Sequence, residues 1–375
     1  GASVPNSMAP GAAPVPLLGV QADTGRFRVS VLVGTKRPGG LDAILHSLSQ
    51  QTRKDFEIIL VDELWERERE TREQAAALGL HVTSVSVSKP KASPQAFGFQ
   101  NAWNTGLAAV SAAYVAIIND YTWVPPRLIE EVVRFYEGEG PDLPPREHRP
   151  WCILGFPVAQ YGVPEEVLDR GQLMNRSALS VFRRHLTAAP SAGGGFGGGP
   201  WEVTDPLGPR DSFWEVFKPH WFWDGQAMIA PRGIFEALNG FDEVLDYGND
   251  CHMQNIRDRA VLLGAQTWLA PAAIAVEEID HHNWFPQGES REFLMFNRLI
   301  KDTNLELWDR LVCRIREGKY PLRAVNYGFD LRDHYAARAA RDDGEGAAGA
   351  AEGTGCLWSA SPDNWRCHLP DYVPA

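Results

Sequence analysis

The stretch FRVSVLVGTKRPGGLDAILHSLSQQTRKDFEIILVD, from Phe27 to Asp62, decides the expected fold. It opens with an apolar, β-branched run that closes at Gly34, and Phe56–Val61 forms a second such run, so both predict buried strands. The residues between them predict one amphipathic helix, because apolar side chains recur at positions i, i+3, i+4 and i+7, namely Leu41, Ile44, Leu45 and Leu48. A strand, a helix and a strand in this order predict parallel strands joined by a right-handed crossover.

The same alternation continues along the next part of the chain. The expected elements are helices at 65–78, 97–110 and 126–136 and strands at 81–87 and 114–118. Strands that alternate with helices predict an α/β fold, here a Rossmann-like, mostly parallel central sheet with helices on both faces. Such sheets bind their ligands at the carboxyl ends of the strands.

The second half of the chain is less regular. A proline-rich connector at 141–150 precedes expected strands at 151–158, 221–230 and 267–276 and expected helices at 231–238, 250–263 and 305–317. The leader 1–25 is expected to be flexible, the glycine-rich run 193–199 to form a mobile surface loop, and 336–375 to form a low-complexity linker and C-terminal tail. A single domain is therefore expected over 26–335.

Composition excludes several classes of protein. Hydrophobic residues make up 44% of the 375 residues, which is too many for a disordered chain. The 48 Asp and Glu exceed the 36 Lys and Arg, so no overall positive field attracts nucleic acid. Five cysteines without a CxxC pair do not predict a zinc ribbon. Without an apolar run of about 18 residues or a signal-peptide pattern, we expect a soluble, cytoplasmic protein.

Acidic and amide side chains follow two of the expected strands. Asp62 ends the second strand, and Asn119 and Asp120 end the fourth. At the carboxyl edge of a parallel sheet, a carboxylate can accept hydrogen bonds from a ribose or a base, or bind a cation that neutralises a diphosphate. The alternative is that each residue only caps a helix or forms a turn.

Three segments together resemble one known family. SVLVGTKRPGGLDAILHSLSQQTRKDFEIILVDE (30–63) is similar to the opening of family 2 glycosyltransferases, with Gly34 in place of a proline and Glu63 in place of a second aspartate. NAWNTGLAAVSAAYVAIINDYTWVPPRLIEEV (101–132) resembles the Asn-x-Gly helix and Asp-x-Asp region of that family, and GFDEVLDYGNDCHMQNIRDRAVLLGA (240–265) its later Gly-Phe-Asp-Glu segment. The resemblance implies a catalytic domain of the GT-A type, with a nucleotide-sugar-binding half at 26–139 and an acceptor-binding half at 140–335.

The resemblance also assigns roles to individual residues. Those implied to bind the nucleotide-sugar are Thr35, Arg37, Asp62, Asn104, Asn119 and Asp120. Asp120 stands at the centre of the metal-binding motif, and His281 or His282 is implied as a second ligand for Mn²⁺ or Mg²⁺, while spacing from Pro271 favours Glu277 instead. The chain departs from the family where Asn119 and Tyr121 replace flanking acids.

Asp250 matches the acid that deprotonates the acceptor in this family, although Asn249 and His252 depart from its surrounding pattern. The alternative role for Asp250 is that of a helix cap. Acceptor binding is expected at Trp223, Asp224 and Gly225, beside an aromatic cluster that suits a pyranose ring or forms part of the core.

The resemblance thus implies a hexosyl- or pentosyltransferase. It would move a sugar from a UDP- or GDP-sugar to a hydroxyl of a glycan, protein or other acceptor, with inversion and with a divalent cation. The alternative is a catalytically inactive GT-A-like module that binds sugar or protein. Nucleotidyl transfer would need a glycine-rich basic loop after the first strand, which 34–40 resembles only loosely.

Overall fold

The structure is a computed structural model. It describes residues 26–35, 41–62, 67–86, 88–89, 99–161, 202–204, 215–216, 227–247, 252–271, 276–279, 307, 310–326 and 328–344. No helix in these ranges is long and apolar enough to cross a bilayer.

Helices and strands alternate through the first half as the sequence predicts. The elements there are β1 (Val29–Thr35), α1 (Leu41–Ser49), β2 (Phe56–Asp62), α2 (Glu68–Ala77), β3 (Val82–Ser86), α3 (Phe99–Ala109), β4 (Tyr114–Asn119), β5 (Thr122–Trp123) and α4 (Leu128–Glu137). Those that follow are η2 (Arg146–Trp151), β6 (Cys152–Gly155), β7 (Val158–Tyr161), β8 (Glu202–Thr204), β9 (Glu215–Val216), β10 (Ala227–Pro231), α7 (Arg232–Leu238), η4 (Glu243–Tyr247), α8 (His252–Leu262), β11 (Gln266–Leu269), β12 (Val276–Ile279) and α10 (Leu331–Gly344).

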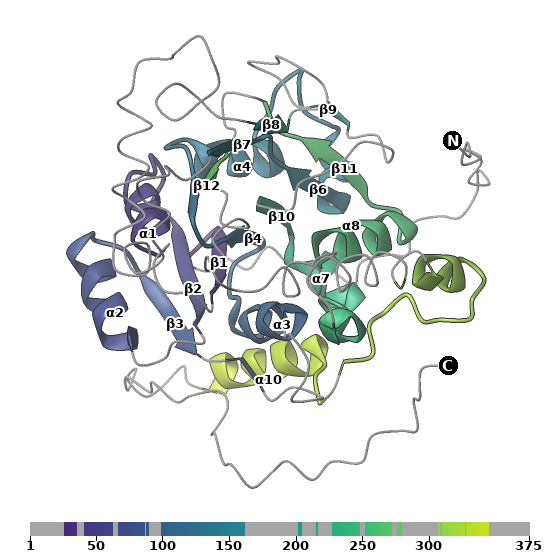
Figure 1. Cartoon of the computed structure of the whole chain (residues 1–375). Helices are drawn as coiled ribbons and strands as arrows, with labels where there is room; N and C mark the ends of the chain where they lie inside the picture. The colour runs from purple at the N-terminus through teal and green to yellow at the C-terminus, as the bar shows by residue number, and fades with distance from the viewer. Residues whose placement is uncertain are drawn as a thin grey trace, which may run out of the picture.

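One eight-stranded sheet forms the centre of the domain, in the order β3-β2-β1-β4-β10-β6-β11-β9 (Figure 1). The first four strands are parallel, whereas β10 runs antiparallel to both of its neighbours. A smaller sheet has the order β5-β12-β7-β8. Strands from both expected halves of the chain therefore share one sheet, which has the predicted α/β, mostly parallel arrangement.

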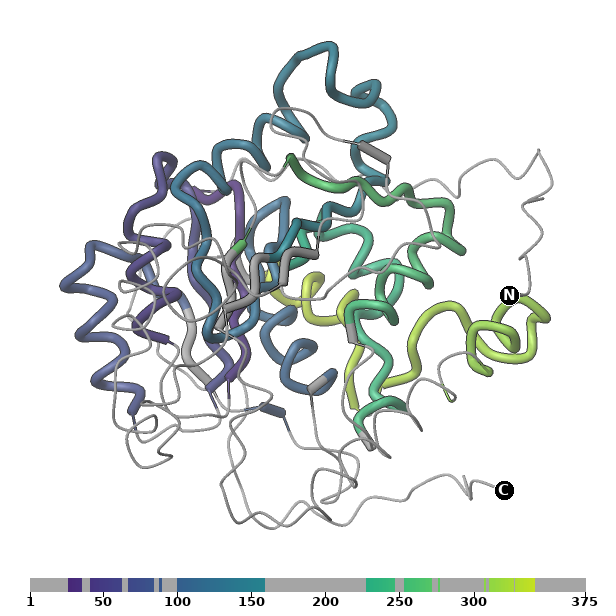
Figure 2. The backbone as a smooth tube through the Cα atoms, turned by 45° about the horizontal axis from the view of Figure 1, so that its top comes forward, coloured from purple at the N-terminus to yellow at the C-terminus, as the bar shows by residue number. Residues whose placement is uncertain are grey.

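Helices cover both faces of the sheet because successive strand residues point to opposite sides (Figure 2). On one face, α1 and α4 pack against side chains that include Val31, Val33, Ile58, Leu60 and Ile118. On the other face, α3, α7 and α8 pack against side chains that include Leu32, Ile59, Val61, Val115 and Ile117. Strands β1, β2 and β4 are buried on both faces, which explains their unbroken apolar runs.

Glu57 is an exception to that apolar pattern. Its carboxylate is fully buried in β2 and accepts hydrogen bonds from the hydroxyls of Ser30, Thr83 and Ser111 and from the backbone N–H of Ser111. These donors come from β1, from β3 and from the turn before β4. The carboxylate therefore joins the four parallel strands at a point away from their carboxyl ends.

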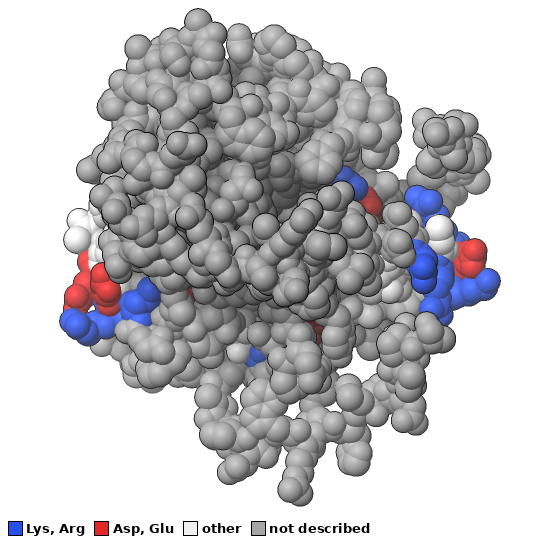
Figure 3. Space-filling model, viewed as in Figure 1, with Lys and Arg blue, Asp and Glu red and all other residues white. Residues whose placement is uncertain are grey.

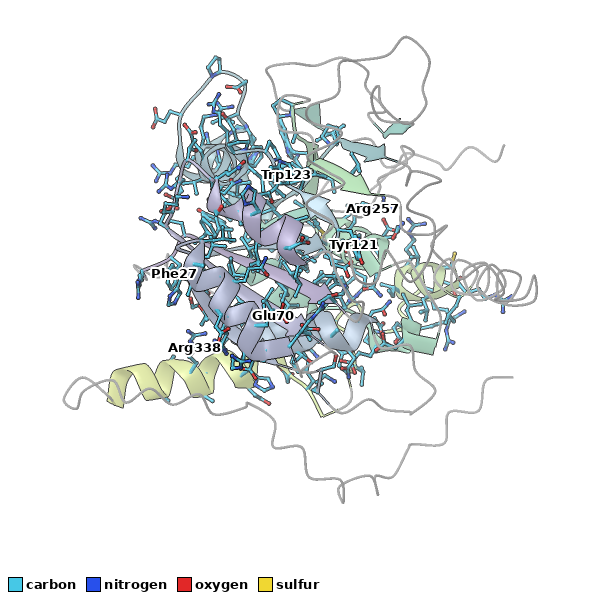
Figure 4. The ribbon with its side chains drawn as sticks, turned by 60° about the vertical axis from the view of Figure 1, so that its left-hand side comes forward. Phe27, Glu70, Tyr121, Trp123, Arg257 and Arg338 are labelled. Carbon is cyan, nitrogen blue, oxygen red and sulfur yellow. The ribbon has the colours of Figure 1, made fainter. Side chains whose placement is uncertain are left out.

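Helix α10 spans residue 335, where the sequence predicts the domain to end. The hydroxyl of Tyr335 donates to the carbonyl oxygen of Leu107 at 2.9 Å, and the Arg338 guanidinium donates to those of Ala109 and Val110. Figure 4 shows Arg338 on α10, beside the body of the domain. A cation at the C-terminal end of α3 also interacts favourably with the helix dipole, so residues up to Gly344 belong to the folded domain.

One further expectation in the second half is adjusted. The single strand expected at 151–158 is divided into β6 and β7, which belong to different sheets. The helix expected at 250–263 is present as α8 from His252 onward, and its first two expected residues lie outside the described ranges.

Candidate functional site

Three residues predicted for the nucleotide site meet at one edge of the sheet. Thr35 ends β1 and is paired in register with Asp62 at the end of β2, while Gly34 is paired with Asn119 at the end of β4. Neighbouring strands lie about 4.8 Å apart, so the three strand ends span about 10 Å. The parallel register therefore brings together side chains that are far apart in the sequence.

Thr35 and Asp120 form a direct contact at this edge. The hydroxyl of Thr35 donates to Oδ2 of Asp120 at 2.7 Å, and the two residues are only 7% and 3% exposed. Gly34, which precedes Thr35, lies against the Trp103 ring, where an added Cβ would be 3.3 Å from two ring carbons. A larger residue at position 34 would thus push β1 away from α3.

Asp62 takes part in an ion pair that the sequence did not predict. Its Oδ2 accepts from Nε of Arg67 at 2.7 Å and its Oδ1 from Nη2 at 3.1 Å. The Asp62 side chain is 0% exposed, whereas the Arg67 side chain is 20% exposed. Both carboxylate oxygens that we expected to face a nucleotide therefore already bind a guanidinium.

The turn after Asp120 has an unusual backbone. Tyr121 has φ 58°, in the left-handed region, although it is a bulky residue and is 3% exposed. Such a conformation costs on the order of 1–3 kcal/mol and persists only where the surroundings enforce it. It directs the chain from β4 into β5, with Trp123 two residues further along (Figure 4).

Strand β12 brings one candidate metal ligand close to this turn. Glu277 is paired with Trp123 and Glu278 with Thr122, in antiparallel register. The chain of β12 therefore runs toward the Asp120–Tyr121 turn and reaches Ile279, the last residue described there. Among the described residues, no group of three or more His, Cys, Asp and Glu side chains could hold a metal ion.

Asn104 connects α3 to the Gly-Phe-Asp-Glu segment. Its Nδ2 donates to the carbonyl oxygen of Phe241 and to Oε1 of Glu243, and its Oδ1 accepts from the Phe241 N–H at 2.8 Å. Gly240 has φ +67°, and a Cβ there would lie 2.2 Å from Oδ1 of Asn104. The Asn104 amide thus forms hydrogen bonds within the protein, and its expected contact with the nucleotide stays a prediction.

A buried ion pair lies next to Asn104. Nζ of Lys89 is 2.8 and 2.9 Å from the two carboxylate oxygens of Glu243, and it lies 5.3 Å from the centre of the Phe329 ring. Both charged side chains are almost fully buried. Burial raises the pKa of Glu243 above its usual range, while Lys89 and the Asn104 amide oppose that rise.

Asp246 caps α3. Its two carboxylate oxygens accept from the backbone N–H groups of Gln100 and Asn101 at 2.7 and 3.0 Å, as N-terminal acids do. Burial, and then the charge of Glu243, raise the pKa of Asp246 to about 7. Asn104, Glu243 and Asp246 therefore attach η4 to α3, immediately before the segment that carries Asp250.

The raised pKa of Asp246 predicts how stability changes with pH. The folded protein binds this proton more tightly than the unfolded chain, so the contribution of Asp246 is largest at acid pH and is lost as pH rises through 7. Relative to Asp246→Asn, the free energy of unfolding of the wild type should fall by about 3 kcal/mol between pH 5 and 8. Urea denaturation of both proteins at several pH values measures this difference.

Asp330→Asn is the matched control for that experiment. The Arg323 guanidinium lowers the pKa of Asp330, so the charge of Asp330 does not change between pH 5 and 8. The difference in free energy of unfolding between Asp330→Asn and the wild type should therefore stay constant over this range. A constant difference for Asp246→Asn as well would show that Asp246 remains ionised in the folded protein.

The other predicted site residues lie outside the described ranges. They are Arg37, Trp223, Asp224, Gly225, Asp250, His281 and His282. Sequence reasoning missed Arg67 and Lys89. Arg67 lies between two glutamates, as Arg69 does two residues later, so no sequence signal distinguishes the two.

The first half of the chain matches a family model. Residues 35–156 match the model described as glycosyl transferase family 2. This range includes Thr35, Asp62 and Asp120 and ends just after β6. No curated protein matches the sequence significantly.

Solved structures with a similar chain path include S. aureus TarS, at 14% identity and a TM-score of 0.40, over 69% of this chain and 38% of that one. TarS 1–349 in complex with UDP-GlcNAc has 11% identity and a TM-score of 0.42, over 70% and 60%. Glucosyl-3-phosphoglycerate synthase from Mycobacterium tuberculosis, in complex with Mn²⁺, UDP and phosphoglyceric acid, has 16% identity and a TM-score of 0.26, over 58% and 60%. The chain thus spans between 38 and 60% of these three proteins.

The family match and the sheet described above agree. The matched residues begin at Thr35, the last residue of β1, and include all of the parallel strands β2, β3 and β4. Residues 35–156 are thus similar to the family 2 glycosyltransferases, and this segment forms most of the parallel part of the central sheet.

Proposed function

We propose that this protein transfers a sugar from a nucleoside-diphosphate sugar to an acceptor hydroxyl. The observation that carries the proposal is the assembly of Thr35, Asp62 and Asp120 at one sheet edge, within the segment that matches the family. The acceptor would be a glycan, a protein or another hydroxyl-bearing molecule, and the transferred group a hexose or a pentose. The acceptor would bind in the half of the chain that contains Trp223, Asp224 and Gly225.

The order of the strands suggests how the donor lies. The ends of β2 and β4 stand on either side of the end of β1, about 10 Å apart. A nucleoside diphosphate laid across them would place its base near Asp62 and its diphosphate near Asn119 and Asp120. Arg37, which follows Thr35 closely, is a further candidate for the diphosphate.

Asp120 is our candidate for the main protein ligand of a divalent cation. Its carboxylate is a hard oxygen ligand of the kind that these cations prefer, and it lies at the carboxyl end of the parallel strands. We propose that it holds Mn²⁺ or Mg²⁺ together with one of Glu277, His281 or His282, of which Glu277 is paired beside the turn by the register of β12. When bound, such an ion stabilises negative charge on a departing diphosphate.

Asp250 is our candidate for the general base. It lies in the four-residue gap between η4 and α8, and η4 is held to α3 by Asn104, Glu243 and Asp246. A carboxylate there would accept the proton of the acceptor hydroxyl as the oxygen attacks the anomeric carbon. Direct displacement without an enzyme nucleophile inverts the configuration at that carbon.

The proposal predicts that nucleoside diphosphates raise the thermal stability of the protein. A ligand that binds only the folded state adds about 2.7 kcal/mol at 100 times its dissociation constant. We expect a clear rise in melting temperature with UDP or GDP in the presence of Mn²⁺, in a panel that also contains CDP and dTDP. If none of the four shifts the transition at millimolar concentration, the proposed function is contradicted.

A second candidate is an inactive module that binds a sugar or a protein. It is favoured by Asn119 and by the strained Tyr121, which stand where the family has acids. Release of free sugar from several sugar nucleotides separates the two functions, because an enzyme of this kind also transfers slowly to water, whereas a binding module leaves the donor intact.

A further inference from the structure

The ion pair of Asp62 and Arg67 changes which side chain a nucleotide can meet at the end of β2. Both carboxylate oxygens accept from the guanidinium, at 2.7 and 3.1 Å, in the two-pronged geometry that fixes the plane of an arginine. The Asp62 side chain is completely buried, whereas Arg67 retains exposed surface. A ligand that approaches this edge therefore reaches the arginine before the aspartate.

We propose that Arg67 recognises the base of the donor nucleotide and selects bases that carry a carbonyl oxygen, with Asp62 as its positioning residue. The inference rests on the proposed function and names the substrate class for its donor site. It reverses the expectation from the sequence, in which Asp62 itself accepts a hydrogen bond from the nucleotide.

The chemistry of the guanidinium determines the selection. Arginine has only N–H donors, so it recognises acceptors, and a carbonyl oxygen is the strongest neutral acceptor on a base. Uracil and guanine carry carbonyl oxygens, whereas adenine carries an amino group and ring nitrogens only. Because the Asp62 carboxylate holds the fork in one plane, little conformational freedom is lost when the base binds.

The position of the pair favours the base over the diphosphate. Asp62 ends β2, and β1 separates it from β4, which leads to Asp120. If the diphosphate lies near Asp120, the base is the part of the nucleotide that reaches Arg67. Recognition of the base can also be distinguished from recognition of the phosphates by comparing nucleotides. All nucleoside diphosphates share the phosphates and differ only in the base.

Calorimetry with UDP, GDP, ADP and inorganic pyrophosphate tests the proposal on the full chain. The wild type should bind UDP or GDP at least about tenfold more tightly than ADP, as one charge-assisted hydrogen bond allows. Which of the two binds more tightly identifies the base. Arg67→Lys keeps a positive charge beside Asp62, so the fold should survive, which a melting curve checks, but the preference over ADP should fall to within about threefold.

Arg69→Lys is the matched control. Arg69 lies two residues further along on α2, and its side chain is 84% exposed and paired with Glu73. The described residues over α2 show charges of both signs at the surface (Figure 3). This variant should keep the base preference of the wild type.

Asp62→Asn tests the positioning role. The asparagine keeps one oxygen acceptor but cannot accept from both Nε and Nη2 of Arg67, so the base preference should fall as it does in Arg67→Lys. The double variant should lose no more than either single variant, since both remove the same oriented guanidinium. Additive losses would instead show that each side chain contacts the nucleotide independently, which contradicts a positioning role for Asp62.

Two further outcomes would overturn the inference. An equal loss of affinity for UDP, GDP, ADP and pyrophosphate in Arg67→Lys would assign Arg67 to the diphosphate. Donor binding with an unchanged base preference in that variant would remove Arg67 from the site while leaving the proposed function intact. If the wild type binds none of these compounds, the proposed function itself fails.

Discussion

Asp250→Asn is expected to lower the rate of sugar transfer by about 10² to 10⁴ fold while donor affinity scarcely changes. Asparagine has almost the same size and caps helices nearly as well, so α8 should still form. It cannot accept the proton of the acceptor hydroxyl, so the loss should appear in turnover rather than in binding. Initial rates and calorimetry with the same nucleotide measure the two quantities separately.

Asp258→Asn is a suitable control for that variant. Asp258 lies on α8, in an ion pair with Arg257, and its side chain is 29% exposed, so its loss should leave turnover nearly unchanged. Near-native transfer by Asp250→Asn would show that Asp250 acts as a helix cap and not as the general base. Asp246 would not be a ready substitute as base, because both of its oxygens accept backbone N–H groups of α3. A product that retains the configuration of the donor would contradict direct displacement.

Asp120→Asn is expected to lower transfer by at least about 100-fold, and excess EDTA should abolish it in the wild type. A bound cation stabilises the developing charge of the transition state by several kcal/mol, and each 1.36 kcal/mol corresponds to a tenfold change in rate. The substitution preserves the acceptor for the Thr35 hydroxyl but removes the charge that attracts the cation. Rates measured over a range of Mn²⁺ and Mg²⁺ concentrations should show a higher requirement in the variant.

Asp142→Asn separates a specific effect from a general change of charge. Asp142 pairs with Arg134 at the end of α4 and has a side chain that is 23% exposed, so this variant should keep both its rate and its metal requirement. Full turnover of the wild type in excess EDTA would show that transfer proceeds without a divalent cation, and Asp120 would then need another role.

Burial patterns in the sequence determined the parallel half of the sheet. The runs that became β1, β2 and β4 are mostly apolar because helices cover both faces, with Glu57 as a buried exception, and the spacing of Leu41, Ile44 and Leu45 predicted α1. Such signals are local, so one sequence suffices to find them. The carboxyl-edge positions of Asp62 and Asp120 followed from the same strand assignments.

The irregular half was predicted less well for a physical reason. β6 and β7 have four residues each and join different sheets, so their pairing partners rather than their own periodicity decide where they end. The composition of 336–344 is rich in alanine and charge, and only its contacts with α3 make it part of the folded domain.

The partners of the charged side chains were decided by the tertiary structure alone. Lys89 and Glu243 are 154 positions apart, and nothing in their local sequences marks them as a buried pair. Arg67 differs from Arg69 only in that the β2 end places Asp62 within reach of its guanidinium. The sequence by itself determined the parallel strands of the first half, the family resemblance and the sheet edge at which Asp62 and Asp120 lie. Only the folded chain decided which side chains face that edge, because ion pairs depend on distances of a few ångströms that local periodicity does not encode.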